Sequence, residues 1–165
     1  MLIGVLSDTH LKRVTSEFKG LVEDHFTKCD LIVHAGDFVD PSVYFYLDKT
    51  SEGKLIAVCG NMDPPELRNL LPQRLVFERL GFKIGVIHGW GSPRDLEARI
   101  LRVFVGDDVR CIIYGHSHNG INHTVDNILF FNPGSPTDNY FAKSLSIGYI
   151  QIQKADIITG EIVAI

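Results

Sequence analysis

The sequence Gly115-His116-Ser117-His118 places two imidazole side chains one residue apart, directly after the apolar run from Cys111 to Tyr114. In an extended segment the side chains of residues i and i+2 point to the same side of the chain. A strand that ends at this point therefore presents both histidines to one small volume. Because imidazole is a frequent ligand of transition metals, the pair indicates half of a metal site.

Four other short motifs with metal-ligating groups follow apolar runs in the same way. They are Asp8-Thr9-His10, Gly36-Asp37, Gly60-Asn61 and His88-Gly89. Taken singly, each has an ordinary explanation, since Gly-Asp and Gly-Asn are common turn pairs and a single histidine is more often structural. Their joint occurrence at the ends of predicted strands indicates one shared metal centre.

The motifs supply seven nitrogen and oxygen donors, and none of them is a thiolate: Asp8, His10, Asp37, Asn61, His88, His116 and His118. Seven donors are too many for one tetrahedral site. Two ions would receive about four each if one carboxylate bridges them. This mixture suits Mn, Fe, Co, Ni or Zn better than Ca or Mg. Two divalent ions and two aspartates leave a net charge of +4 − 2 = +2, which attracts an anionic substrate.

The segments that must position these donors alternate between strands and helices in the first half of the chain. Apolar runs predict strands, and three- and four-residue spacings predict helices, with Thr15 or Ser16 as the first N-cap. In order they are the strand Leu2–Leu6, the helix Thr15–Lys28, the strand Asp30–His34, the helix Pro41–Lys49 and the strand Leu55–Cys59. This order implies a parallel sheet whose functional groups gather at the carboxyl ends of its strands.

The second half predicts a hairpin, one helix and then strands alone. The hairpin joins Arg74–Glu78 to Phe82–Ile87, and the helix Ser92–Val105 has Ser92 as its cap and Pro93 at its first position. Strand-like runs follow at Arg110–Tyr114, Gly120–Val125, Ile128–Asn132, Leu145–Gln153 and Ala155–Ile165, with turns at Asp126-Asn127 and at Asp156 with Gly160. A parallel half and a mainly antiparallel half predict two packed sheets with helices outside.

Composition limits the class of protein. The 165 residues predict one globular domain, with 45% hydrophobic and 22% charged residues. A net charge of −4 gives no electrostatic reason for nucleic-acid binding. Three cysteines without a C-x-x-C spacing fit a reducing compartment. Leu2–Leu6 is too short for a signal-peptide core, and no run approaches the roughly 20 residues of a membrane span. We therefore expect a cytoplasmic protein that does not bind membranes.

The series of motifs, from Asp8-x-His10 to Gly115-His116-x-His118, resembles the calcineurin-like metallophosphoesterases. The short chain and the later Asn132-Pro133-Gly134-Ser135 are most similar to the compact phosphodiesterase subfamily of bacteria and archaea. The resemblance runs from Leu2 to about Ser135. It implies an α/β fold, a four-layer α/β/β/α sandwich of two mixed β-sheets flanked by helices, with residues 1–165 as a single metallophosphoesterase domain.

The resemblance also implies two divalent transition-metal ions per chain, with manganese as the first candidate and nickel, iron, cobalt or zinc as alternatives. One ion would be held by Asp8, His10, Asp37 and His118, and the other by Asp37, Asn61, His88 and His116. A hydroxide shared by the metals would attack phosphorus in line. Asp37, Asn61 and His88 are the expected catalytic residues. His34 and Asp63 are candidates for supporting the ligands through hydrogen bonds.

One position departs from the family pattern. Many relatives carry a histidine directly after the Gly-Asn pair, where it protonates the leaving group, but this chain has Met62. A thioether cannot donate a proton, so we expect a small phosphodiester substrate with a good leaving group, such as an aryl diester. Which diester is not readable from the sequence, because specificity would lie in loops such as Trp90–Arg94 and Pro136–Tyr140.

Two alternatives stay open. The compact fold also resembles the retromer scaffold subunit, in which a similar pocket serves mainly as a binding surface, so the chain could be a non-catalytic interaction module. A homodimer is the second alternative, since the aromatic residues Phe38, Tyr44, Phe45 and Tyr46 could form a dimer face. Core packing explains them better.

Overall fold

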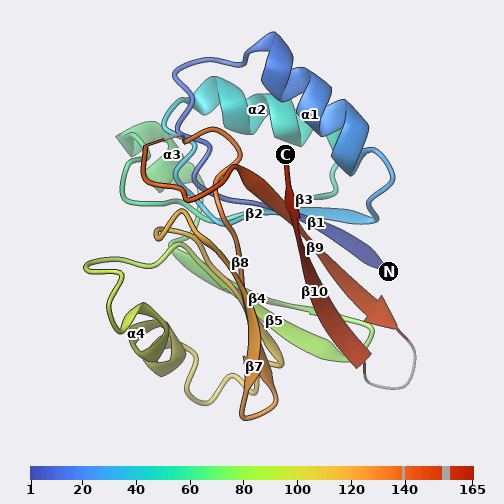
Figure 1. The fold of residues 1–165 in the computed structure, drawn as a ribbon, viewed down its shortest axis with the longest axis vertical. Helices are drawn as coiled ribbons and strands as arrows, with labels where there is room; N and C mark the ends of the chain where they lie inside the picture. The colour runs from blue at the N-terminus through green and yellow to red at the C-terminus, as the bar shows by residue number, and fades with distance from the viewer. Residues whose placement is uncertain (139, 154–156) are drawn as a thin grey trace.

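The computed structural model describes residues 1–138, 140–153 and 157–165. This part of the chain forms two five-stranded sheets that pack face to face, with helices on both outer sides (Figure 1). The predicted four-layer α/β/β/α sandwich is confirmed. None of the helices in these ranges is long and apolar enough to cross a membrane.

The first sheet combines both ends of the chain. Its order is β10-β9-β1-β2-β3. The three N-terminal strands pair in parallel, whereas β9 pairs antiparallel with both β1 and β10. The strands are β1 (Leu2–Leu6), β2 (Leu31–His34), β3 (Leu55–Ala57), β9 (Ser146–Gln153) and β10 (Ile157–Ala164). The strand β1, which leads to Asp8, therefore lies in the middle of the sheet between β9 and β2.

The second sheet has the order β4-β5-β6-β8-β7. Its strands are β4 (Arg74–Arg79), β5 (Phe82–Ile87), β6 (Cys111–Ile113), β7 (Gly120–Val125) and β8 (Ile128–Pro133). The predicted hairpin of β4 and β5 is present. The expectation of a mainly antiparallel second half is confirmed by the pairs β4–β5, β7–β8 and β9–β10, but β5, β6 and β8 pair in parallel, which the sequence did not predict. Helix α4 (Leu96–Val103) provides the crossover from β5 to β6 that parallel pairing requires.

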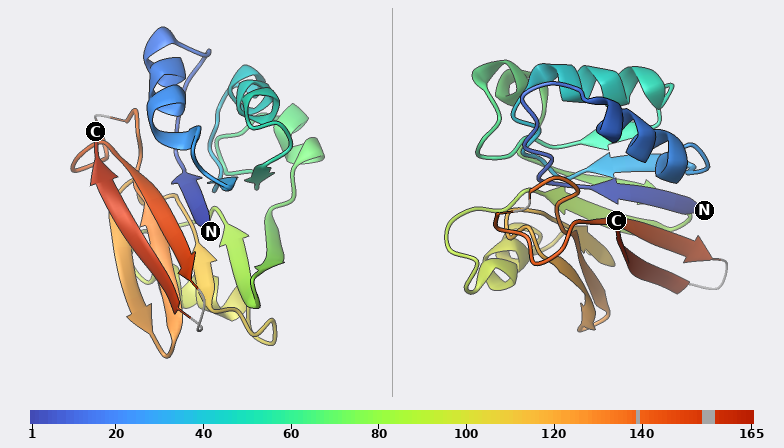
Figure 2. Two further views of the ribbon diagram at one scale, coloured as in Figure 1. Left: turned by 90° about the vertical axis from the view of Figure 1, so that its right-hand side faces the viewer. Right: turned by 45° about the horizontal axis from the view of Figure 1, so that its top comes forward.

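Alternating side chains explain the layers. In β1, Ile3 and Val5 enter the core between the sheets, whereas Leu6 enters the core under the helices. In β6, Ile113 faces the first of these cores and Ile112 faces α4. Such alternation buries both faces of β1 and β6. Figure 2 shows the outer layers, with α1 (Ser16–Phe26) and α2 (Pro41–Thr50) on one side and α4 on the other.

The helix starts agree with the sequence patterns in α1 and differ from them in α4 and α3. Thr15 caps α1 as predicted, its hydroxyl accepting a hydrogen bond from the Phe18 amide at 3.2 Å. The predicted start of α4 at Ser92 is wrong, since the helix begins at Leu96 after Asp95, whose φ of 56° is left-handed. The sequence patterns did not predict the short helix α3 (Pro65–Leu70), which begins at the second residue of the double proline 64–65.

The C-terminal strands differ from the predicted turns. Gly160 is not a turn residue, because it pairs with Ile150 inside the β9–β10 ladder. The predicted turn at Asp156 and the first residues of the predicted strand at 155–165 lie outside the described residues.

Of the aromatic residues at 38–46, Phe38 is fully buried, whereas Phe45 is 49% exposed.

Candidate metal centre

Five strand ends deliver the predicted ligands to one place. Asp8, Asp37 and Asn61 follow the parallel strands β1, β2 and β3, while His88 and His116 follow the parallel strands β5 and β6. Because the carboxyl ends of parallel strands lie at one edge of each sheet, packing the two sheets brings the two edges together. The carboxylates come mainly from the first sheet, and most of the imidazoles come from the second.

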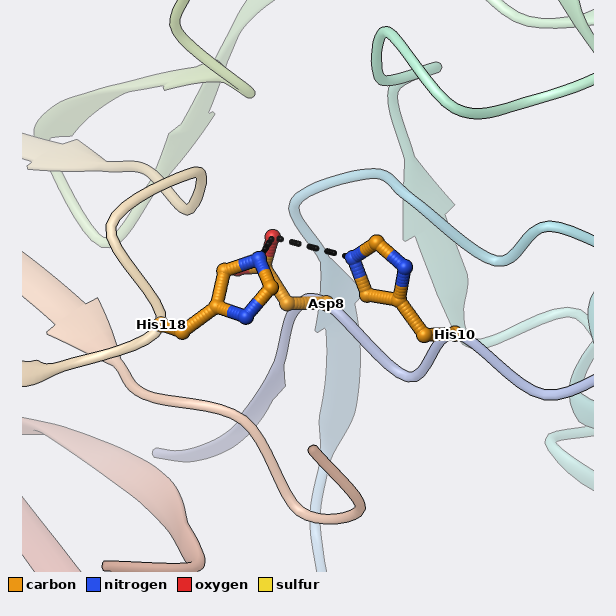
Figure 3. Close-up of side chains that lie close together, drawn as sticks. All are labelled: Asp8, His10 and His118. Carbon is orange, nitrogen blue, oxygen red and sulfur yellow. Dashed lines mark ion pairs between the residues drawn. The ribbon is translucent and has the colours of Figure 1, made fainter. Parts of the chain in front are cut away.

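The carboxylate of Asp8 lies between two histidines (Figure 3). Its Oδ1 atom is 3.2 Å from Nε2 of His118 and 3.8 Å from Nε2 of both His10 and His88. Oδ2 of Asp37 lies 3.4 Å from Nε2 of His10 and 3.2 Å from Nε2 of His88. Two overlapping groups with metal-binding potential result, Asp8–His10–His118 and Asp8–Asp37–His88.

Two ring nitrogens in this cluster have no hydrogen-bond partner. Nε2 of His10 and Nε2 of His88 are buried and form no hydrogen bond among the described residues, although each lies within ion-pair distance of Asp37. The Ala35 carbonyl lies 2.8 Å from Nδ1 of His88, so Nδ1 carries the proton of the neutral ring and Nε2 presents a lone pair to the carboxylates. A buried polar atom without a partner is costly unless a ligand satisfies it. Nitrogen and oxygen donors in this arrangement therefore fit a divalent transition metal.

Charge compensation explains the ionisation of the metal-free cluster. The carboxylates of Asp37 and Asp8 raise the pKa of His10 to about 10, against the effect of burial. Burial favours the neutral form of Asp8, but His10 and His118 outweigh it and hold the pKa of Asp8 well below its ordinary value. The pKa of Asp37 is likewise lowered by His10 and His88 in spite of burial. Without metal, protonated imidazole thus balances the carboxylates.

Metal affinity is therefore expected to rise with pH. An ion must displace the proton of His10, whose pKa is raised from 6.5 to about 10. Between about pH 7 and pH 9, the affinity for Mn²⁺ should increase roughly tenfold per pH unit for each proton released. Titration calorimetry in buffers of different ionisation enthalpy measures both the Mn²⁺ affinity and the number of protons released. His123→Gln is the control, since His123 pairs with Glu97; an affinity that does not change with pH would contradict the prediction.

Asn61 and His116 form the outer edge of the cluster. Oδ1 of Asn61 lies 3.0 Å from Nδ1 of His116, and Nε2 of His116 lies 2.6 Å from the Gly91 carbonyl oxygen. Both ring nitrogens of His116 thus have protein partners, and one would have to exchange its partner to bind an ion. The ligand roles of Asn61 and His116 stay predictions.

The backbone of the ligand residues is unusual. Asp8, His10, Asp37, His116 and His118 all have positive φ values, from 43° to 69°. Such left-handed conformations are uncommon for residues other than glycine and cost of order 1–3 kcal/mol each. Hydrogen bonds to the loop after β2 hold two of them, since the Asp8 amide donates to the Gly36 carbonyl and the His10 amide to that of Asp37. Strain of this kind gathers at functional sites.

The two residues predicted to support the ligands do so in different ways. Asp63 is almost fully buried and accepts hydrogen bonds from the amides of Asp37 at 3.1 Å, Val39 at 2.9 Å and Gly60 at 2.7 Å. It therefore joins the loops after β2 and β3.

His34 is fully buried, and burial lowers its pKa to about 3. Its neutral ring accepts from the Gly36 amide at 3.2 Å, contacts the Thr9 hydroxyl at 3.3 Å and stacks on Phe38. Each of its hydrogen-bond partners is next in sequence to an aspartate ligand.

Asp138 is a site residue that the sequence reasoning missed. Its carboxylate forms a short hydrogen bond with Nδ1 of His118, which leaves Nε2 facing Asp8. Its amide donates to the hydroxyl of Ser135, which in turn donates to the Asp8 carbonyl at 2.7 Å. Metal-ligating histidines usually have such a carboxylate or carbonyl partner. The nearby Asn132–Ser135 motif was the available signal, although it does not specify the partner.

Comparison with known proteins identifies the family. A family model for the calcineurin-like phosphoesterase superfamily domain matches residues 1–155. The chain belongs to this superfamily. A probable metallophosphoesterase of Methanocaldococcus jannaschii is 41% identical over 141 residues, covering 83% of this chain and 69% of its own. A phosphodiesterase of the same organism is 24% identical over 168 residues, covering 94% and 96% of the two chains.

Solved structures share the fold of this calcineurin-like chain. The structure of a novel archaeal phosphodiesterase has a TM-score of 0.72 at 21% identity and covers 99% of this chain and 100% of its own. Vps29 of Chaetomium thermophilum has a TM-score of 0.74 at 22% identity, covering 98% and 93%. At these identities the similarity establishes the fold alone.

Proposed function

We propose that this member of the superfamily is a metal-dependent phosphodiesterase with two divalent ions. The observation that carries the proposal is the position of Asp37. Its Oδ2 atom faces two buried, unpaired imidazole nitrogens, on His10 at 3.4 Å and on His88 at 3.2 Å. A carboxylate oxygen between two such nitrogens supports the assignment of Asp37 as a ligand shared by two ions.

In this proposal Asp8, His10, Asp37 and His118 hold one ion, and Asp37, Asn61, His88 and His116 hold the other. Bound divalent ions supply charge neutralisation at the phosphoryl oxygens and an activated water. Two divalent ions would outweigh the charges of the two aspartates and leave the site positive, which draws in an anionic diester. In the proposal Asn61, whose side chain is exposed, would also position a phosphoryl oxygen.

Turnover of a chromogenic aryl phosphodiester by chelator-stripped protein tests the proposal. We expect Mn²⁺, Ni²⁺ or Zn²⁺ to restore hydrolysis of bis-p-nitrophenyl phosphate, with p-nitrophenyl phosphate hydrolysed more slowly. Asp37→Ala should lose this activity. Two bound ions per chain without turnover by any metal would contradict the proposal.

Met62→His is expected to accelerate hydrolysis of diesters with alkyl leaving groups. The Met62 side chain is 55% exposed, and its amide donates to Oδ1 of Asp37 at 2.7 Å, a contact that the substitution retains. General acid catalysis contributes about a hundredfold or more when a leaving group requires a proton. Rates on diethyl phosphate and bis-p-nitrophenyl phosphate provide the comparison. Met62→Gln, which supplies no such acid, is the control; an equal alkyl rate for both variants would show that no acid is missing.

An interaction scaffold is the second candidate. Tyr140 and Phe141 are 85% and 66% exposed, and the Phe141 ring stands edge-on to His118 at 5.7 Å between centroids. Exposed aromatic side chains beside a metal centre suit a protein partner as well as a substrate. Metal binding without turnover would favour this function.

A further inference from the structure

A cavity of about 450 Å³ lies beside the metal centre, on the side of Asn61 and His88. This volume is large enough for one organic substituent of a small diester. Trp90, Ile87 and Val103 contribute apolar surface to its walls. The indole of Trp90 is 46% exposed and can therefore contact a bound molecule.

Two arginines line the same cavity, but only the charge of Arg74 is compensated by an ion pair. Nη2 of Arg74 lies 2.6 Å from Oδ2 of Asp107, and its guanidinium packs over the Phe104 ring. The Arg74 charge is thus compensated. Nη2 of Arg68 donates to the Asn61 carbonyl at 2.6 Å, and a carbonyl carries no net charge. Within the described ranges Arg68 takes part in no ion pair.

We propose that this cavity binds a substituent of the phosphodiester that carries a second anionic group, which the Arg68 guanidinium holds. The proposal rests on the proposed function, because the cavity begins at Asn61 and His88. A guanidinium binds carboxylate or phosphate through two parallel hydrogen bonds, and the contact with Asn61 fixes its position. The scissile phosphate lies at the metals, and the second anion lies at the far end of the substituent.

Two synthetic substrates with one leaving group test this assignment. They are p-nitrophenyl 3-carboxypropyl phosphate and p-nitrophenyl butyl phosphate, which differ only in whether the four-carbon chain ends in a carboxylate. The metal-loaded protein is expected to show about tenfold higher kcat/KM for the carboxylate, in the range of one charged hydrogen bond. Because the chemical step is the same, the ratio reports the distal contact.

Arg68→Gln is expected to reduce this ratio to about one. Arg79→Gln is the matched control and should retain the ratio, since Arg79 is exposed on β4, outside the cavity, and donates to the Glu78 carbonyl. A wild-type ratio of one or below overturns the proposal. So does a variant that slows both substrates equally, because Arg68 would then only position the Asn61 loop. Turnover of neither substrate overturns the phosphodiesterase function itself.

Discussion

Gly60→Ala is expected to abolish metal binding and turnover. A Cβ atom at Gly60 would lie 2.1 Å from Oδ1 of Asp37 and 2.5 Å from the Asp37 amide nitrogen. Backbone cannot move away as a flexible side chain can, so the loop that carries Asp37 must shift. A shift of about 1 Å in a ligand is enough to lose a metal site or a large part of catalysis.

Gly20→Ala is the matched control for this substitution. Gly20 lies inside α1, and no atom lies within 4 Å of a Cβ built there. Alanine is favoured over glycine in a helix by roughly 0.5–1 kcal/mol, so the control should be slightly more stable and fully active. Mn²⁺ titration and diester hydrolysis measure both variants. Normal Mn²⁺ affinity in a folded Gly60→Ala protein would show that the loops tolerate the displacement.

Asp63→Ala is expected to lower both stability and metal affinity. The substitution leaves three amide donors in the loops after β2 and β3 without their acceptor, on Asp37, Val39 and Gly60. Three unsatisfied donors at 1–3 kcal/mol each give about 3–9 kcal/mol, and we expect a loss in the free energy of unfolding at the lower end of this range, because the Val39 hydrogen bond is only partly buried. Metal affinity should fall roughly 10–100-fold, as for other residues that orient ligands.

Asp40→Ala is the control that separates the effect on stability from the effect on metal affinity. Asp40 also accepts a backbone hydrogen bond, from the Ser42 amide at 2.9 Å, but as the N-cap of α2. Its replacement should cost about 1 kcal/mol and leave metal affinity unchanged. Urea unfolding with and without Mn²⁺ measures both variants. An Asp63→Ala protein with wild-type affinity would mean that other contacts hold Asp37 in place.

The sequence was sufficient for the parts of the fold that depend on local patterns. Apolar runs identified strands such as β1 and β2, and the motif ends identified the candidate ligands that the two sheets bring together. Resemblance to a family supplied the four layers. Strand partners were not readable, so the parallel pairing of β5, β6 and β8 was missed. Pairing depends on contacts distant in sequence, which a local pattern does not contain.

The backbone conformation and the supporting contacts of the candidate metal centre were predicted less completely than its candidate ligands. The left-handed conformations of Asp8 and His10 are uncommon for residues other than glycine and are held by hydrogen bonds to the loop after β2. Asp138 was missed because its role depends on where the loop returns to His118, not on a spacing. The start of α4 was misplaced because Ser92 and Pro93 are typical of a helix start, whereas the helix begins after Asp95.

The position of β1 between β2 and β9 has a consequence for the order of events during synthesis. The β9 strand that pairs with β1 comes about 140 residues after it, and Asp138 is needed to orient His118. A chain emerging from the ribosome therefore carries Asp8, His10 and Asp37 for most of its translation without the partners that complete the centre. Long-range closure of this kind is slow relative to local folding. We therefore expect the Asp8–His10–His118 group to form late, after His118 and β9 have been synthesised, whereas the residues of the Asp8–Asp37–His88 group are present earlier.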